Sequence, residues 1–77
     1  MTRKTPVITG MELVKVLERA GFEVRRQKGS HLHMFRDIDR RRVTIPVHNG
    51  KNIPMGTLKG IVNDADISVE QLRDLLK

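Results

Sequence analysis

The residues best suited to chemistry in this sequence are its three histidines, and His31 stands in the most distinctive surroundings. The stretch Gln27-Lys28-Gly29-Ser30-His31 separates two segments that have the alternating composition of β-strands. Glycine accepts the positive φ of a tight hairpin turn, and serine is a common turn residue. A hairpin would therefore deliver His31 at the start of a strand. Because imidazole titrates near neutrality, we interpret His31 as a candidate proton-transfer residue, the alternative being a histidine that only hydrogen-bonds the turn.

Basic side chains surround this histidine in the sequence. Fifteen lysines and arginines against nine acidic residues give a net charge of +6, which predicts attraction to polyanions. A solubilising surface charge is the alternative, but Arg25, Arg26 and Lys28 cluster just before His31 and favour a nucleic-acid surface. We interpret Lys28 as the candidate to bind a phosphate. The alternative is that it is only an exposed lysine of the turn. Arg40, Arg41 and Arg42 form a second cluster, which is typical of a solvated turn.

The other two histidines have weaker signals. His33 lies on the same face of the predicted strand as His31. It is a candidate general acid or phosphate contact, the alternative being an exposed histidine without a role. His48 falls in a predicted loop. No carboxylate or thiolate is fixed beside the histidines, so we predict no metal site and no metal requirement.

Length and composition restrict the class of protein. The chain has 77 residues and no cysteine, which excludes a disulfide scaffold and a thiolate zinc site. No apolar run approaches the roughly 18 residues of a membrane span, and the N-terminus lacks the apolar segment of a signal peptide. We expect a single domain over residues 1–77, without cofactor or membrane contact, in the cytoplasm.

Periodicity predicts the elements that must position His31. After a lead-in over residues 1–8, helical spacing of apolar residues predicts helices over 10–20, 54–65 and 69–76. Alternation predicts strands over 22–27, 31–36 and 42–47. Two matches to the capping-box pattern, Thr9 with Glu12 and Ser68 with Gln71, mark helix starts.

This order predicts an α+β fold, a helix, a three-stranded antiparallel sheet and a helix, with a short C-terminal helix. The same order is that of the double-stranded-RNA-binding domain. Pro46, which lacks an amide donor, predicts either that the third strand is an edge strand or that the proline nitrogen faces no partner. The helices would cover one face of the sheet against Phe22, Val24, Leu32, Met34, Val43, Ile45 and Val47. The other face would stay open, with Arg25, Gln27, His31, His33, Phe35 and Thr44.

Several segments, in this order and spacing, resemble the HicA family of type II toxin–antitoxin mRNA interferases. They are Val7-Ile8-Thr9-Gly10-Met11-Glu12-Leu13, Ala20-Gly21-Phe22-Glu23-Val24, Arg26-Gln27-Lys28-Gly29-Ser30-His31, Arg42-Val43-Thr44-Ile45-Pro46-Val47-His48 and Gly56-Thr57-Leu58. The resemblance implies a fold like the double-stranded-RNA-binding domain, with His31 of the Gly-Ser-His motif as the catalytic residue. It also implies ribosome-independent RNA cleavage, held in check by a HicB antitoxin. Many members have a second histidine where this chain has Leu32.

Together these observations predict an endoribonuclease toxin that cleaves single-stranded RNA with His31 as general base. The residues expected to contact RNA are Lys28, Gly29, Ser30, Arg25, Arg26 and His33. The expected partners are mRNA and a HicB-like antitoxin, with the toxin monomeric alone and in a larger hetero-oligomer with its antitoxin. A non-catalytic RNA-binding module and a purely protein-binding domain are the alternatives.

Overall fold

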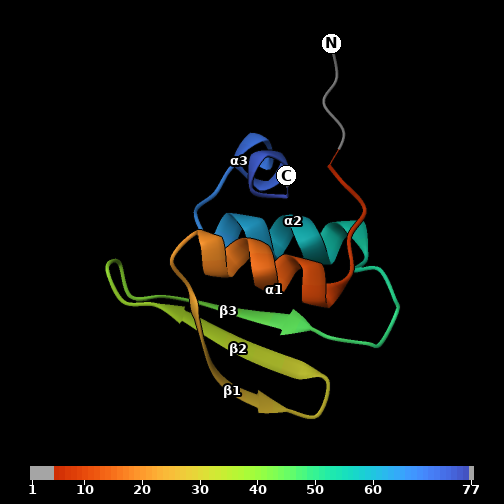
Figure 1. Cartoon of the computed structure of the whole chain (residues 1–77), viewed down its shortest axis with the longest axis horizontal. Helices are drawn as coiled ribbons and strands as arrows, with labels where there is room; N and C mark the ends of the chain where they lie inside the picture. The colour runs from red at the N-terminus through yellow and green to blue at the C-terminus, as the bar shows by residue number, and fades with distance from the viewer. Residues whose placement is uncertain (1–4, 77) are drawn as a thin grey trace.

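The computed structural model describes residues 5–76, so the first four residues of the predicted lead-in and Lys77 lie outside the described residues. Its elements are α1 (Gly10–Arg19), β1 (Glu23–Lys28), β2 (His31–Arg36), β3 (Arg41–Pro46), α2 (Met55–Asp64) and α3 (Val69–Leu75), as Figure 1 shows. Every predicted element is present, and its ends agree with the prediction to within one residue.

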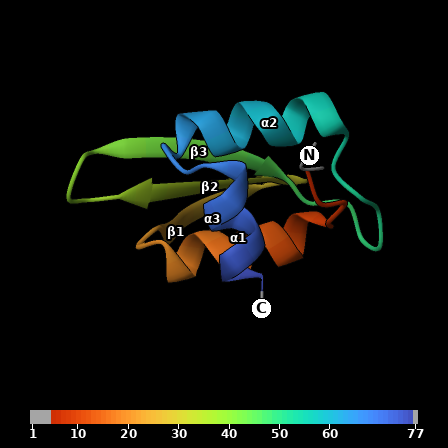
Figure 2. The ribbon, with the colours of Figure 1, turned by 90° about the horizontal axis from the view of Figure 1, so that it is seen from above.

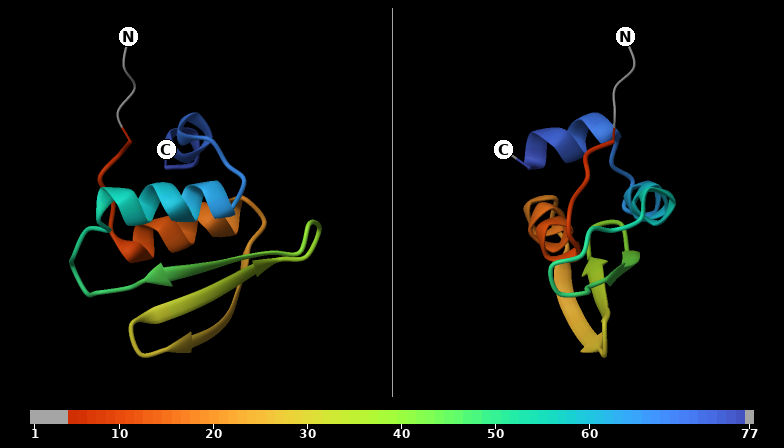
Figure 3. Two further views of the ribbon diagram at one scale, coloured as in Figure 1. Left: turned by 180° about the vertical axis from the view of Figure 1, so that it is seen from behind. Right: turned by 90° about the vertical axis from the view of Figure 1, so that its right-hand side faces the viewer.

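The sheet is antiparallel in the order β1-β2-β3, so β3 is an edge strand, the first of the two arrangements that Pro46 predicts. In Figure 1 β3 lies next to the helices and β1 is the outermost strand. Helices α1 and α2 lie side by side between the sheet and α3 (Figure 3). Seen from above, α3 runs across this pair (Figure 2). The predicted α+β arrangement is therefore confirmed, and the sheet face away from the helices is left open.

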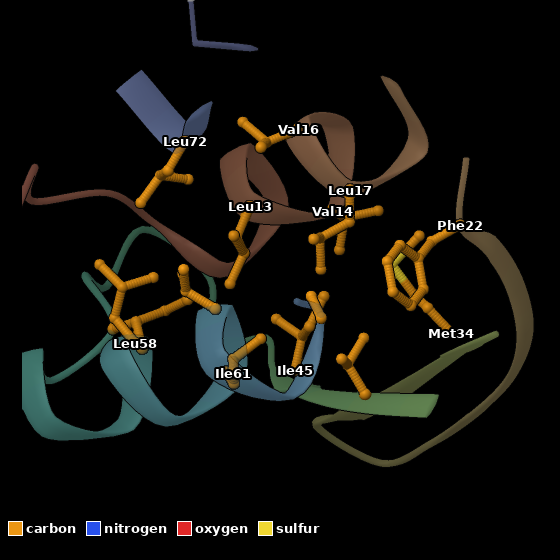
Figure 4. Close-up of a cluster of buried hydrophobic side chains, with 14 of the residues drawn as sticks. Leu13, Val14, Val16, Leu17, Phe22, Met34, Ile45, Leu58, Ile61 and Leu72 are labelled. Atoms are coloured by element: carbon orange, nitrogen blue, oxygen red, sulfur yellow. The ribbon is translucent and has the colours of Figure 1, made fainter. Parts of the chain in front are cut away.

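The core fills the space between the helices and the sheet. Leu13 and Leu17 of α1 meet Ile45 of β3 and Leu58 of α2, all four fully buried, and Leu72 brings α3 into the same cluster (Figure 4). Among the residues predicted to face the helices, five are buried: Phe22, Leu32, Met34, Val43 and Ile45.

Two of the predicted core residues are less buried than expected. Val47 is partly buried against the core, and Val24 is 45% exposed, so its assignment to the core is wrong. No side chain of β1 is buried, because the helices pack mainly over β3 and leave the outermost strand uncovered. β1 is consequently free to present its side chains to a ligand.

Both predicted capping boxes are present. The Thr9 amide donates to Glu12 Oε1 at 2.8 Å, and the Glu12 amide donates to Thr9 Oγ1 at 3.2 Å. Ser68 and Gln71 make the same reciprocal pair at 2.8 and 3.0 Å. Each box satisfies amides that a helix start leaves without partners, which is why the local sequence fixes where α1 and α3 begin.

Gly10 sets how closely α1 approaches the end of β3. A β-carbon at this position would lie 2.4 Å from the Pro46 carbonyl oxygen and 3.0 Å from Val47 Cα, both backbone atoms that cannot move aside easily. Pro46 is also the β3 neighbour of His31, so this contact supports the strand beside the histidine.

Replacing Gly10 with alanine should destabilise the fold, because the added methyl must push α1 off β3. We expect a loss of about 1–3 kcal/mol in the free energy of unfolding, measured by urea denaturation. Gly60→Ala is the matched control, because Gly60 also lies in a helix but a β-carbon added to it would have no neighbouring atom within 4 Å. An equal effect of the two substitutions would contradict the close contact at Gly10.

Arg36 is a structural residue that sequence patterns did not single out. Its guanidinium donates to the Ala20 carbonyl at the end of α1 (3.1 Å) and to the Ala65 carbonyl at the end of α2 (2.9 Å). It also donates to both Asp39 carboxylate oxygens, at 3.0 and 2.7 Å, and lies 4.6 Å from the Phe22 ring centroid. With its side chain only 13% exposed, Arg36 ties both helices to the end of the sheet.

The pair formed by Arg36 and Asp39 predicts a loss of stability in acid. Hydrogen bonds from the guanidinium hold the pKa of the Asp39 carboxyl below its usual value. A lowered folded-state pKa contributes stability that is complete above the unfolded value of about 3.9 and is lost as the pH falls through the lower folded value. We therefore expect the urea midpoint to fall between pH 6 and pH 3, and to fall less in Asp39→Asn. The same acid sensitivity in both proteins would contradict this assignment.

Candidate functional site

The predicted tight hairpin before His31 is present, and its loop of two residues is one shorter than the gap between the predicted strands. Lys28 pairs with His31, so only Gly29 and Ser30 connect β1 to β2. Gly29 has φ of +59° and Ser30 has no positive φ, the combination typical of a type II′ turn. The Ser30 carbonyl accepts a 2.7 Å hydrogen bond from the Val47 amide, which anchors the turn to the chain leaving β3.

His31 lies on the open face of the sheet. Leu32 and Met34 of β2 are buried under the helices, so the alternating residues His31, His33 and Phe35 face the other way. The side chain of His31 is exposed between Lys28 of β1 and Pro46 of β3. No hydrogen bond to its ring comes from any of residues 5–76, so the structure gives no support to a histidine that braces the turn. Leu32, at the position of the family's second histidine, is in the core.

A β-bulge at Arg25 decides which cations of β1 share this face. The register runs from Val24 opposite Met34 directly to Arg26 opposite His33, which leaves Arg25 as the extra residue. Arg26 and Lys28 consequently stand beside the histidines of β2.

Gln27, by contrast, lies opposite Leu32 on the side of the helices, so its predicted place on the open face is wrong. Its amide nitrogen instead donates to the Gly29 carbonyl at 3.2 Å, within the turn. Strict alternation fails here because the bulge inserts one residue and reverses the facing of everything after it.

β3 adds polar groups from the other side. Thr44 lies opposite His33, and a 3.0 Å hydrogen bond joins Thr44 Oγ1 to His33 Nδ1. This bond restrains the orientation of the His33 ring, whose Nε2 has no hydrogen-bond partner among residues 5–76. Arg42 lies opposite Phe35 on the same face.

The open face contains two shallow hollows that meet at His33 and Thr44. The first, which we call the histidine hollow, is lined by Lys28, Gly29, Ser30, His31, His33 and Thr44. The second, the arginine hollow, is lined by Arg25, Arg26, His33, Met34, Phe35, Asp37, Arg40, Arg42, Val43 and Thr44. Both are open to solvent, as expected for a small domain whose site lies on a sheet surface.

Every residue predicted to act on or contact RNA lines one of these hollows. Arg25 and Arg26 line the arginine hollow, His33 lines both, and the others line the histidine hollow. His48 lines neither and is exposed in the loop after β3.

The second arginine cluster divides in a way that the sequence did not show. Arg41 is within ion-pair distance of Asp39 (3.2 Å) and Asp66 (3.7 Å), whereas Arg40 and Arg42 line the arginine hollow. Alternation along β3 could have placed Arg42 with Thr44, since these residues are two apart.

The histidine hollow has the groups required for acid–base chemistry on a bound anion. It combines an exposed imidazole, a lysine directly across the strand pair, and a second imidazole about 7 Å further along β2. Among residues 5–76, no three histidine or acidic side chains come together as a metal site would require.

Comparison with known proteins finds a family match for this chain, although it finds no individual curated relative. A search of curated proteins finds no match. Among residues 5–76, no helix is both long and apolar enough to cross a membrane. The family described as "HicA toxin of bacterial toxin-antitoxin" matches residues 10–67, which cover α1, the whole sheet with both hollows, and α2. The chain therefore belongs to the HicA toxin family of bacterial toxin–antitoxin systems.

Proposed function

We propose that this toxin is an endoribonuclease that cleaves single-stranded mRNA without a ribosome, with His31 as the general base. The observation that carries the proposal is the exposed His31 ring, which has no hydrogen-bond partner within residues 5–76 and lies opposite Lys28 in a hollow on a cationic sheet face. RNA supplies its own nucleophile, the ribose 2′-hydroxyl. The protein needs to supply only a base, charge stabilisation and alignment.

The chemistry follows from these groups. Neutral His31 removes the 2′-hydroxyl proton as that oxygen attacks the adjacent phosphorus. Lys28 stabilises the negative charge on the phosphoryl oxygens, and the bond from phosphorus to the 5′ oxygen breaks. The products are a 2′,3′-cyclic phosphate and a 5′-hydroxyl, whose proton comes from solvent or from the ring of His33.

The test uses end-labelled single-stranded RNA and purified protein in EDTA. We expect cleavage, with 2′,3′-cyclic phosphate ends, and no cleavage of the same RNA carrying 2′-O-methyl groups. A gel shift without cleavage would instead identify a non-catalytic RNA-binding module. Cleavage of the methylated RNA would contradict the 2′-hydroxyl mechanism.

Membership of a toxin–antitoxin family implies an antitoxin partner. We propose that a HicB-like antitoxin covers the open face and shields His31 with acidic residues that match its charge. The toxin alone would be a monomer and would join a larger hetero-oligomer with its antitoxin.

A further inference from the structure

The arginine hollow contains a set of cations that the fold itself does not use. Arg36 and Arg41, which hold the sheet to the helices, are paired with Asp39. In the described part of the chain, no ion pair involves the four arginines of the hollow, Arg25, Arg26, Arg40 and Arg42. Unpaired guanidinium groups gathered in one depression suit an anionic ligand, since arginine recognises phosphate by paired hydrogen bonds.

The hollow also contains the one phenylalanine ring that this face has among residues 5–76. The chain has two phenylalanines and no tyrosine or tryptophan. Phe22 is in the core at 2% exposure, whereas Phe35 is only partly buried and lines the hollow.

Each phenylalanine lies under an arginine, but the two arginines are held differently. Arg36, 4.6 Å from the Phe22 centroid, is fixed by hydrogen bonds to two helix ends and to Asp39. Arg25 lies 4.8 Å from the Phe35 centroid, and its side chain makes no hydrogen bond to any of residues 5–76. Arg25 can therefore swing aside and expose the ring face at little cost.

The two hollows form one continuous path. They share His33 and Thr44, and His31 and Phe35 lie about 13 Å apart along β2, on the same face. A strand whose scissile phosphate lies at His31 would thus run on over the arginines.

We propose that the arginine hollow is a second subsite for single-stranded RNA, in which an unpaired base stacks on Phe35. Arg25, Arg26 and Arg42 bind the phosphates next to the one cleaved. Arg25 moves off the ring to admit the base. An unpaired strand is the fitting ligand, because a cationic groove with an aromatic platform is how proteins bind single strands, while a duplex keeps its bases covered. This inference rests on the proposed function for the identity of the ligand.

The test measures RNA binding in a His31→Ala background, so that the labelled strand stays intact. Arg25→Gln with Arg42→Gln should reduce the slope of log affinity against log salt by about 0.7 for each phosphate that the protein no longer neutralises. Lys59→Gln is the control, an exposed cation on α2, and should leave the slope unchanged. Phe35→Leu should weaken binding by about 5- to 100-fold, with the urea midpoint confirming that the variant folds.

The possible failures are distinguishable. If these variants keep the RNA affinity and salt slope of the His31→Ala parent, the proposed subsite is overturned, but the proposal that His31 cleaves RNA is not affected. Variants that keep full RNA affinity but lose the antitoxin would show that the hollow is the antitoxin's docking surface instead. A wild-type protein that neither binds nor cleaves RNA would overturn both proposals.

Discussion

Replacement of His31 by alanine will lower the rate of RNA cleavage by about 10²–10⁴-fold, the usual contribution of a general base. The ring is exposed and has no hydrogen-bond partner among residues 5–76, so its loss should remove the proposed proton acceptor without disturbing the turn or the core. RNA affinity should change little, because Lys28 and the arginine hollow remain. Single-turnover cleavage of a labelled RNA, with protein in excess, measures the chemical step separately from binding.

His48→Ala is the matched control, because this exposed histidine lies outside both hollows and should leave cleavage at the wild-type rate. The urea midpoint of His31→Ala should stay close to wild type, as for most surface substitutions. A His31→Ala protein that cleaves at full rate would remove the catalytic assignment. Loss of activity accompanied by unfolding would point to a structural role instead.

Replacement of Arg36 by alanine should lower the free energy of unfolding by about 2–4 kcal/mol, more than the replacement of Gly10. The substitution leaves the Ala20 and Ala65 carbonyls and the Asp39 carboxylate without their donor and removes the cover of the Phe22 ring. A domain of this size has only about 5–10 kcal/mol of stability in total. Urea denaturation followed by far-UV circular dichroism measures the loss.

Arg36→Lys tests whether geometry or charge matters. An ammonium group has one nitrogen and cannot reach two helix ends and a carboxylate together, so we expect lysine to recover less than half of the loss. Arg26→Ala provides the comparison at an exposed arginine that has no ion-pair partner in the described part of the chain, where the change should be within about 0.5 kcal/mol. Equal losses for Arg26→Ala and Arg36→Ala would disprove the bridging role of Arg36.

Local sequence patterns predicted most of this structure because local physics decides those features. Two capping boxes mark where α1 and α3 begin, and a glycine at the turn position that needs a positive φ defines the hairpin at Gly29. Alternation along β2 predicted that His31 lies on the sheet face away from the core, because Leu32 and Met34 occupy the core face. These signals require no knowledge of the rest of the chain.

The features that the sequence did not predict depend on contacts between distant segments. Val24 is the one apolar residue of β1, so the sequence pattern fits a regular strand as well as a strand with a bulge. The bulge moves Gln27 to the other face, which is why the predicted place of Gln27 on the open face is wrong. The role of Arg36 depends on two helix ends that meet only in the folded protein. For the same reason, the sequence cannot tell that, among residues 5–76, Arg41 has acidic partners while Arg42 has none.

The bulge at Arg25 separates β1 into two parts that pair with β2 in different registers. Val24, before the bulge, lies opposite the buried Met34, whereas Arg26 and Lys28, after it, lie opposite His33 and His31 on the open face. Substitutions in the tip can accumulate without repacking the interior, because no side chain there is buried. The charge of the face that carries both hollows can therefore be altered while the scaffold beneath it stays the same.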